Sequence, residues 1–517
     1  MLRIVKNRLL QQRVCSLARC ISNASAAFTD PLQYTSGKRE LPSDIDSTDT
    51  TDVLEPATGR LLCRMKNSGV TDVNRSVEIA KQSLDGEWGQ MSGTERGKIL
   101  LRAAQIIRDN CEDISKVEVH DTGKAIWEAR ADIEGCADAI EYYGGVAPTI
   151  AGEHFALPQG SFAYTIREPL GVVGGIGAWN YPFQMAAWKS GPALACGNSM
   201  VFKPSQFTPL TAVLLAEVYS EAGLPAGAFN VIQGGASTGS LLSHHPDVAK
   251  MTFTGSMATG TKIMEACAQG IKYITLELGG KSPLIIFDDC DMENAIKGTM
   301  MANFLTQGQV CSNGTRVYVQ RSIYDEFVSR LVERVNNMKI GNPFSEDTHV
   351  GATISREQFD IVMKYIKNAK SQGAKFVCGG EQVTPDDPAL AKGLFISPAV
   401  VTDVTDKMQI AREEVFGPVA CIFPFDTQQE VIQRANNSEF GLAGGVFTKD
   451  LKRAHHVVQK IQSGNLYVNN YNIYPSQIPF GGYKKSGLGR EGGISFIEYY
   501  TQQKTVYVEM NDVDCPF

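Results

Sequence analysis

Residues 171–203 read GVVGGIGAWNYPFQMAAWKSGPALACGNSMVFK, and this stretch decides the fold. Two short apolar runs, GVVGGI and SMVFK, flank a helical segment that begins near Gln184. The alternation continues further along the chain, and the predicted strands are residues 172–176, 199–203, 229–232 and 250–254. Short apolar strands separated by helices are typical of a parallel sheet with helices on both faces. The sequence therefore predicts an α/β fold with a nucleotide-binding sheet, whose ligands lie at the carboxyl ends of the strands.

A second alternating unit runs from residue 282 to about residue 478 and contains the stretch FLTQGQVCSNGTR, residues 304–316. Cys311 lies there in a glycine-flanked turn, after a predicted helix and before a predicted strand. A thiol held between two rigid elements is open to a substrate and well placed to react. Cysteine is also often a small buried apolar residue, so this stretch alone leaves both roles open.

Composition narrows the class of protein. A chain of 517 residues predicts two or three domains. The net charge of −7 does not indicate a nucleic-acid partner, and no apolar run is long enough to cross a membrane. The twelve cysteines contain no CxxC pair and the seven histidines no HxxxH pair, so we expect no metal site and a reducing compartment.

The N-terminus differs from the rest of the chain. Residues 1–28 carry five basic side chains and no acidic one, and several apolar residues share one helical face. This pattern is typical of a mitochondrial transit peptide and predicts the mitochondrial matrix. The alternative is a frayed tail on a cytoplasmic protein.

Two polar features follow strands of the first unit. The turn FTGSMATG, residues 253–260, leaves a strand and enters a helix, whose N-terminus favours the negative charge of a phosphate. Glycine at such a turn is also common for steric reasons alone. Lys203 ends another strand, where it can reach a ribose hydroxyl or a phosphate, or remain a solvated lysine.

Two further residues suit acid–base and oxyanion chemistry. Glu277 lies in the apolar run TLELGGK, and burial of an unpaired carboxylate raises its pKa towards that of a general base. An ion pair with Lys281 is the alternative. Asn180 lies between two aromatic residues just past a strand, where its amide can hold an oxyanion or cap its own turn.

Seven motifs in this order resemble the NAD(P)-dependent aldehyde dehydrogenase superfamily, over about residues 50–510. They are WNYP, FKPS, FTGS, ELGGKSP, GQVCSNGTR, EEVFGPV and PFGGYKKSGLGRE. A closer likeness to the betaine-aldehyde and aminoaldehyde dehydrogenases is carried by KSGPALACGN, LELGGKSPLIIF, MANFLTQGQVC and PFGGYKKSG.

The resemblance implies a division of the chain into a Rossmann-like cofactor domain, an α/β catalytic domain and a small β arm for oligomerisation. The expected ranges are 29–153 and 171–280 for the cofactor domain, 281–478 for the catalytic domain, 154–170 and 495–517 for the arm, and 479–494 for a return segment to the cofactor domain. Within the arm, residues 161–167 and 504–510 alternate like exposed edge strands, which commonly pair across subunit interfaces. We expect a homotetramer, with a dimer as the alternative.

The resemblance also implies the roles of individual residues. Cys311 is the nucleophile, Asn180 holds the oxyanion and Glu277 activates the water that releases a carboxylic acid. The expected NAD contacts are Trp179, Lys203, Ser205, Gln206, Gly255, Ser256, Gly260, Leu278, Glu414 and Phe416. Many NAD-preferring members carry a Glu where this chain has Gln206, and a neutral amide repels a 2′-phosphate less than a carboxylate does.

The closer likeness implies a cationic aldehyde such as 4-trimethylaminobutyraldehyde, in carnitine or betaine metabolism. Asp132, Tyr181 and Tyr471 are the expected substrate contacts, because an ammonium group binds aromatic faces and carboxylates. The alternatives are a general aliphatic aldehyde dehydrogenase, a coenzyme A-acylating dehydrogenase, and a non-catalytic protein on the same fold.

Overall fold

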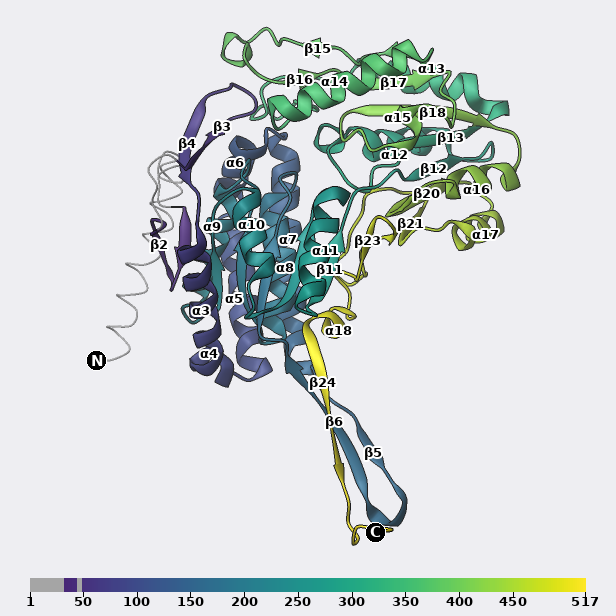
Figure 1. The fold of residues 1–517 in the computed structure, drawn as a ribbon. Coiled ribbons are helices and arrows are strands. Elements are labelled where there is room, and N and C mark those ends of the chain that lie inside the picture. The colour runs from purple at the N-terminus through teal and green to yellow at the C-terminus, as the bar shows by residue number, and fades with distance from the viewer. Residues whose placement is uncertain (1–31, 44–48) are drawn as a thin grey trace.

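The computed structural model describes residues 32–43 and 49–517 and contains two large sheets and a projecting arm (Figure 1). The predicted transit peptide, residues 1–28, lies outside the described residues. Within them, no helix is long and apolar enough to cross a membrane. The described residues also contain no cluster of His, Cys, Asp and Glu that could hold a metal ion.

The first sheet has eight strands. In spatial order they are β2 (Lys38–Glu40), β1 (Gln33–Thr35), β9 (Phe229–Val231), β8 (Ser199–Lys203), β7 (Val172–Ile176), β10 (Val248–Thr254), β11 (Tyr273–Glu277) and β23 (Gly487–Leu488). The strands from β9 to β11 are parallel, and the edge strands pair antiparallel. The four predicted strands are therefore confirmed as neighbours in a parallel sheet. The edge strands β1, β2 and β23 were not predicted.

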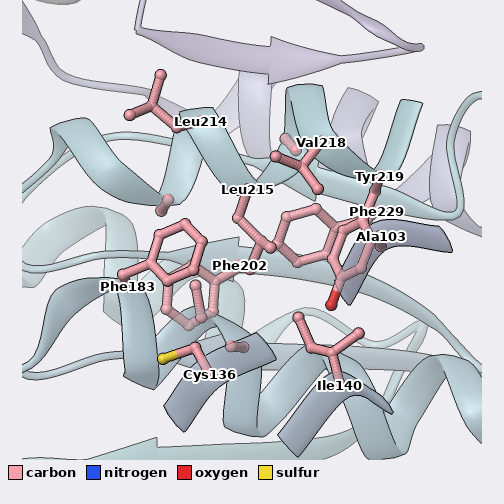
Figure 2. Packing of buried hydrophobic residues seen from close by; sticks show 14 of the residues in the cluster. Ala103, Cys136, Ile140, Phe183, Phe202, Leu214, Leu215, Val218, Tyr219 and Phe229 are labelled. Carbon is pink, nitrogen blue, oxygen red and sulfur yellow. The ribbon is translucent and has the colours of Figure 1, made fainter. Parts of the chain in front are cut away.

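Helices cover both faces of this sheet. Successive side chains of each buried strand point to opposite faces, so both faces are apolar and each packs against its own helices. On β8, Met200 and Phe202 belong to one buried apolar cluster and Val201 to another. The first cluster includes residues of α5 (Gly93–Asp109), α6 (Cys111–Thr122), α7 (Ile126–Val146), α8 (Pro182–Ala195) and α9 (Leu210–Ala222). The second includes residues of α3 (Val70–Asp85), α10 (Ala236–His244) and α11 (Met257–Gln269). Figure 2 shows Phe202 in the same buried cluster as Phe183 of α8 and Leu215 of α9.

The second sheet has seven strands and carries the catalytic cysteine candidate at one end. In order they are β14 (Lys375–Cys378), β17 (Ala399–Thr402), β18 (Val419–Phe425), β13 (Arg316–Gln320), β12 (Pro283–Ile286), β20 (Ala443–Phe447) and β21 (Asn465–Val468). All neighbours pair in parallel except β14. One face packs on α12 (Met292–Phe304) and α13 (Tyr324–Asn336), and the other on α14 (Arg356–Ser371), α15 (Gln409–Arg412), α16 (Gln428–Asn436) and α17 (Leu451–Lys460).

The arm is a three-stranded antiparallel sheet that extends away from the body (Figure 1). Its strands are β5 (His154–Ala156), β6 (Phe162–Pro169) and β24 (Thr501–Val508). The two predicted edge strands thus pair with each other inside one chain. Helix α18 (Phe496–Tyr500) lies in the range predicted for the arm, but Phe496 and Tyr500 are buried in the core of the first sheet. The projecting strand therefore begins only at Thr501.

The remaining elements are short. They are the hairpin β3 (Thr50–Leu54) and β4 (Leu61–Lys66), α4 (Glu87–Gln90), the pairs β15 (Gln382–Val383) with β16 (Phe395–Ile396) and β19 (Phe440–Gly441) with β22 (Tyr483–Lys484), and 3-10 turns at Ala147–Thr149, Pro158–Gly160, Leu305–Gly308, Arg321–Ile323 and Pro388–Leu390. The turn at Leu305–Gly308 leads directly to Cys311 and is important for the site.

Candidate active site

A cavity of about 370 Å³ lies where the carboxyl ends of the first sheet face the Cys311 loop of the second. Cys311, Glu277 and Asn180 all line it, although they are far apart along the chain. The other predicted site residues that line it are Asp132, Trp179, Tyr181, Gly255, Ser256, Leu278, Glu414 and Phe416. The predicted residues Lys203, Ser205, Gln206, Gly260 and Tyr471 do not line it.

Cys311 follows the turn Leu305–Gly308 and precedes β13, and it is partly exposed. Burial raises the pKa of its thiol to about 12, and the carboxylates of Glu414 and Glu277 act in the same direction. The backbone N–H groups of Cys311 and Ser312 oppose this increase, because they favour the thiolate. The thiol is therefore protonated at neutral pH and must lose its proton when it reacts.

Asn180 follows β7 and lies just before α8, and its side chain is buried. Its Nδ2 donates a hydrogen bond to the backbone oxygen of Gln309 at 2.9 Å. Gln309 is two residues before Cys311, so this bond fixes the amide relative to the nucleophile loop. The second N–H of the amide is left for an oxygen of a substrate, which is the arrangement of an oxyanion donor.

Glu277 is the last residue of β11 and is buried. Neither of its carboxylate oxygens has a hydrogen-bond partner within the described part of the chain. Burial raises its pKa well above the usual value, Glu491 raises it further, and Lys189 and Arg490 lower it. The alternative ion pair with Lys281 is not formed. A carboxyl group that is buried and unpaired next to a thiol is suited to general base catalysis.

A buried ion pair lies beside Glu277 and was not predicted. Lys189 of α8 donates from Nζ to Glu491 Oε1 at 2.6 Å and to Thr254 Oγ1 at 2.7 Å. Glu491 also lines the cavity. The only signal in the sequence was its place at the end of the glycine-rich motif PFGGYKKSGLGRE, whereas Lys189 lies in an apolar helix without any signal.

One end of the cavity fits a bound dinucleotide. Ser256 is the N-cap of α11, and the first turn of that helix contains no acid, so its N-terminus suits a phosphate. Glu414 accepts a hydrogen bond from Gly280 N at 3.0 Å through Oε1, which leaves Oε2 for a ribose hydroxyl. Phe416 has a left-handed backbone (φ 56°), and its ring contacts Trp179 edge to face at 5.1 Å between centroids.

Lys203 lies outside this cavity, at the carboxyl end of β8. Its Nζ donates to the backbone oxygens of Pro204 at 2.7 Å and Gly234 at 2.9 Å, and burial lowers its pKa to about 8. Two bonds leave the third ammonium N–H for a ribose hydroxyl, so the residue fits the predicted cofactor contact.

The other predicted cofactor residues outside the cavity differ in character. Ser205 accepts a hydrogen bond from Phe207 N at 3.3 Å, so its hydroxyl caps its own turn. Gln206 approaches Gly235 so closely that a Cβ there would lie 2.5 Å from Gln206 Oε1. At Gly260 a Cβ would lie 2.6 Å from the side chain of Leu278, so this glycine lets α11 pack closely against a residue of the cavity wall.

The predicted substrate acid, Asp132, already has a counter-ion. Lys124 is fully buried, and its Nζ lies 2.5 Å from Asp132 Oδ2 and 3.8 Å from Glu118 Oε1. The same ammonium lies 3.9 Å from the centroid of the Tyr181 ring, so it occupies one face of that ring. No feature of the sequence indicated Lys124.

Tyr471, a predicted substrate contact, does not line the cavity. The residue is buried, and its hydroxyl donates to the backbone oxygen of Ser312 at 2.9 Å. Tyr474, three residues further on, lines the cavity instead, and its hydroxyl bonds the side chains of Ser312 and Asn472. The alternation of tyrosines in this loop could not show which of them faces the cavity.

These features place a thiol, an amide donor and a buried carboxyl group around one cavity, next to a dinucleotide-compatible surface. The chain belongs to the aldehyde dehydrogenase family: the model of the Aldehyde dehydrogenase family matches residues 44–506. The predicted family, fold class and enzyme class are thereby confirmed.

Individual relatives are similar over almost the whole chain. The chain is 56% identical to 4-trimethylaminobutyraldehyde dehydrogenase of Homo sapiens, over 96% of this chain and 100% of the relative. It is 55% identical to 4-trimethylaminobutyraldehyde dehydrogenase A of Danio rerio, over 98% of this chain and 100% of the relative. Among solved structures, betaine aldehyde dehydrogenase from Staphylococcus aureus in complex with NAD+ superposes with a TM-score of 0.92 at 38% identity, covering 96% of this chain and 99% of that chain.

Proposed function

We propose that this chain oxidises a cationic aldehyde to a carboxylic acid, with NAD+ as the oxidant and 4-trimethylaminobutyraldehyde as the favoured substrate. The observation that carries the proposal is the convergence of Cys311, Asn180 and Glu277 on one cavity. The net reaction converts an aldehyde, NAD+ and water to a carboxylate, NADH and two protons.

The sulfur of Cys311 attacks the aldehyde carbon, and its proton leaves to solvent through the open cavity. The aldehyde oxygen becomes an oxyanion, which accepts hydrogen bonds from the Asn180 amide and from the backbone N–H of Cys311. Loss of one such donor typically costs about 3 kcal/mol in the barrier. The bond between Asn180 and Gln309 keeps the donor in place before the charge develops.

Bound NAD+ supplies the acceptor for the hydride that leaves the thiohemiacetal carbon. The product on the protein is a thioester of Cys311. Glu277 then takes a proton from a water molecule that attacks the thioester carbon, and the acid leaves while the thiol is restored. Neither oxygen of Glu277 has a hydrogen-bond partner among the described residues, so no contact has to break before the carboxylate accepts a proton from water.

NAD+ is preferred over NADP+ in this proposal. Lys203, Ser256 and Glu414 fit the ribose and phosphate groups common to both, and solved relatives contain NAD+. Gln206 is the residue that weakens discrimination, because it carries no charge to repel a 2′-phosphate. A higher kcat/KM with NADP+ than with NAD+ would overturn this preference.

The substrate end of the cavity favours a quaternary ammonium group. Trp188, Tyr474 and Phe480 line it and contact one another edge to face, with Phe480 between the other two. Aromatic faces attract a cation by about 0.5–2 kcal/mol each, depending on desolvation. Asp132 adds a carboxylate whose charge is shared with Lys124.

The test compares 4-trimethylaminobutyraldehyde with 5,5-dimethylhexanal, its uncharged carbon isostere. The proposal expects a kcat/KM ratio well above one for the wild type, NADH formation without coenzyme A, and no NADH with Cys311→Ala. Equal kcat/KM values would exclude a cation site and leave a general aldehyde dehydrogenase. A requirement for coenzyme A would indicate the acylating alternative, and NADH formation by Cys311→Ala would remove the nucleophile from the mechanism.

The proposal extends to assembly and location. The arm exposes apolar side chains such as Phe155, Ile166 and Tyr507, which supports a homotetramer built through arms. The basic, acid-free residues 1–28 support import into the mitochondrial matrix, where the reaction would serve carnitine metabolism. Mass photometry tests the tetramer, and the location of a C-terminally tagged chain with and without residues 1–28 tests the import.

A further inference from the structure

The turn before Cys311 has an unusual backbone. Thr306 and Gln307 both have left-handed conformations, with φ of 50° and 56°. Such conformations cost about 1–3 kcal/mol for residues other than glycine, and a β-branched residue such as threonine is a clear outlier. They persist only where the surroundings fix them, so the contacts of Thr306 determine how the chain enters the nucleophile loop.

Glu128 of α7 supplies one of these contacts from the other sheet unit. Its Oε1 accepts a hydrogen bond from the backbone N–H of Thr306 at 2.9 Å, across 178 residues of sequence. Tyr181 supplies a second contact, because its hydroxyl lies 2.7 Å from Thr306 Oγ1. Within the turn, the backbone N–H of Gln309 bonds the oxygen of Thr306 at 3.0 Å, which links the position of Thr306 to the residue that holds Asn180.

The surroundings of Glu128 favour a role as a hydrogen-bond acceptor and not as a charge. The side chain is buried, and burial raises its pKa to about 8. A protonated carboxyl group keeps one acceptor oxygen, so the bond to Thr306 does not need the anion. The neighbouring charges are Lys124 and Asp132, which already pair with each other.

We propose that Glu128 is a positioning residue, which fixes the Thr306–Gln309 turn and thereby places Cys311 against the Asn180 amide. The inference deepens the proposed function, because it rests on the role of Cys311 as nucleophile. A displacement of the nucleophile by about 1 Å can cost about 100-fold in rate, so a lost anchor of this turn has a measurable effect.

The experiment compares Glu128→Gln with Glu128→Ala in the full-length protein. Glutamine keeps an acceptor oxygen at the same reach, so we expect its kcat within about threefold of wild type. Alanine leaves the buried N–H of Thr306 unpaired, and we expect kcat to fall by about 10- to 100-fold with KM for NAD+ unchanged. The rate of alkylation of Cys311 by iodoacetamide should change more than threefold in the alanine variant only, since it reports the loop without turnover.

A matched control separates this role from the general effect of removing a buried acid. Glu118 lies in the same charged cluster, 3.8 Å from Lys124, but has no hydrogen bond to the turn. Glu118→Ala should change the free energy of unfolding while kcat and alkylation stay within about threefold of wild type.

Three results would overturn the role of Glu128. The first is a loss of kcat in Glu128→Gln as large as in Glu128→Ala, and the second is a folded Glu128→Ala variant whose kcat and alkylation rate stay near wild type. The third is a Glu118→Ala variant that loses as much kcat as Glu128→Ala. If the alanine variant does not fold, the glutamine variant decides alone, and a loss above tenfold contradicts the proposal. Turnover by Cys311→Ala would refute the proposed function. The role of Glu128 in fixing the turn could still be judged, because the alkylation rate of Cys311 in the Glu128 variants does not depend on turnover.

Discussion

The buried pair of Lys124 and Asp132 allows a double-mutant test of stability and of substrate choice. The Nζ to Oδ2 distance is 2.5 Å, Lys124 is fully buried and the Asp132 side chain is 17% exposed. We expect Lys124→Met and Asp132→Asn each to destabilise the protein, because each leaves the partner charge buried without compensation. The expected size is about 3–5 kcal/mol for each single variant.

The two variants are not equivalent. In Asp132→Asn, the ammonium of Lys124 retains the carboxylate of Glu118 at 3.8 Å, so the loss of stability should lie near the lower end of that range. In Lys124→Met, the group that lowers the Asp132 pKa is gone, so burial raises that pKa further and protonation relieves part of the cost at low pH. The double variant removes both charges, and the remaining Glu118, whose pKa burial raises to about 7, is protonated once Lys124 is gone. We therefore expect most of the stability to be recovered, to within about 1 kcal/mol of wild type.

Urea unfolding at neutral pH, followed by tryptophan fluorescence, measures these energies. The kcat/KM ratio of 4-trimethylaminobutyraldehyde to 5,5-dimethylhexanal measures the effect on the substrate. Asp132→Asn leaves the buried ammonium of Lys124 behind Tyr181 of the cavity wall without its carboxylate, so the ratio should fall about tenfold, which corresponds to about 1.4 kcal/mol. Additive stability effects, or a ratio that none of the variants changes, would contradict the idea that this pair sets the charge of the pocket.

Three further predictions concern catalysis, pH and packing. Glu277→Gln should leave a burst of about one NADH per active site and lower the steady-state rate by about 100- to 10,000-fold, measured by stopped-flow absorbance, because the thioester forms but water is not activated. Since the thiolate of Cys311 is the reactive form and burial raises its pKa to about 12, alkylation by iodoacetamide should rise about tenfold per pH unit from pH 7 to 9 and show no plateau. Gly464→Ala should destabilise by several kcal/mol in urea unfolding, because a Cβ there would overlap the Gly481 carbonyl oxygen, whereas Gly145→Ala, with open space in α7, should stabilise by about 0.5–1 kcal/mol.

The sequence predicted the fold best where periodicity is strong. The predicted strand at residues 172–176 matches β7 because a fully buried parallel strand appears as an uninterrupted apolar run. The edge strands β1, β2 and β23 have two or three residues each, which is too short for any pattern to show. The range that the resemblance implies for the arm includes helix α18, whose burial depends on contacts with distant helices and has no local pattern.

For the site, the sequence located residues that lie at strand ends inside glycine-rich motifs. Glu277 and Asn180 both follow this rule, since parallel strands present their carboxyl ends at one edge. Lys124 and Glu128 could not be found in this way. Glu128 lies on α7 and meets Thr306 only because α7 packs against the Cys311 loop, and Lys124 lies in the connection between α6 and α7 and pairs with Asp132 of α7. Neither contact has a local signature in the sequence.

Three consecutive residues after β7 each contact a different part of the site. Trp179 contacts Phe416 at the cofactor end, Asn180 bonds Gln309 in the nucleophile loop, and Tyr181 bonds Thr306 at the start of that loop. The loop itself belongs to the second sheet, so the first sheet determines the geometry of a nucleophile that it does not carry. A change in the position of this segment would therefore alter the cofactor wall, the oxyanion donor and the thiol together. This arrangement explains why the strain at Thr306 is retained in the turn, since a relaxed turn would separate the thiol from the amide that must stabilise the charge it creates.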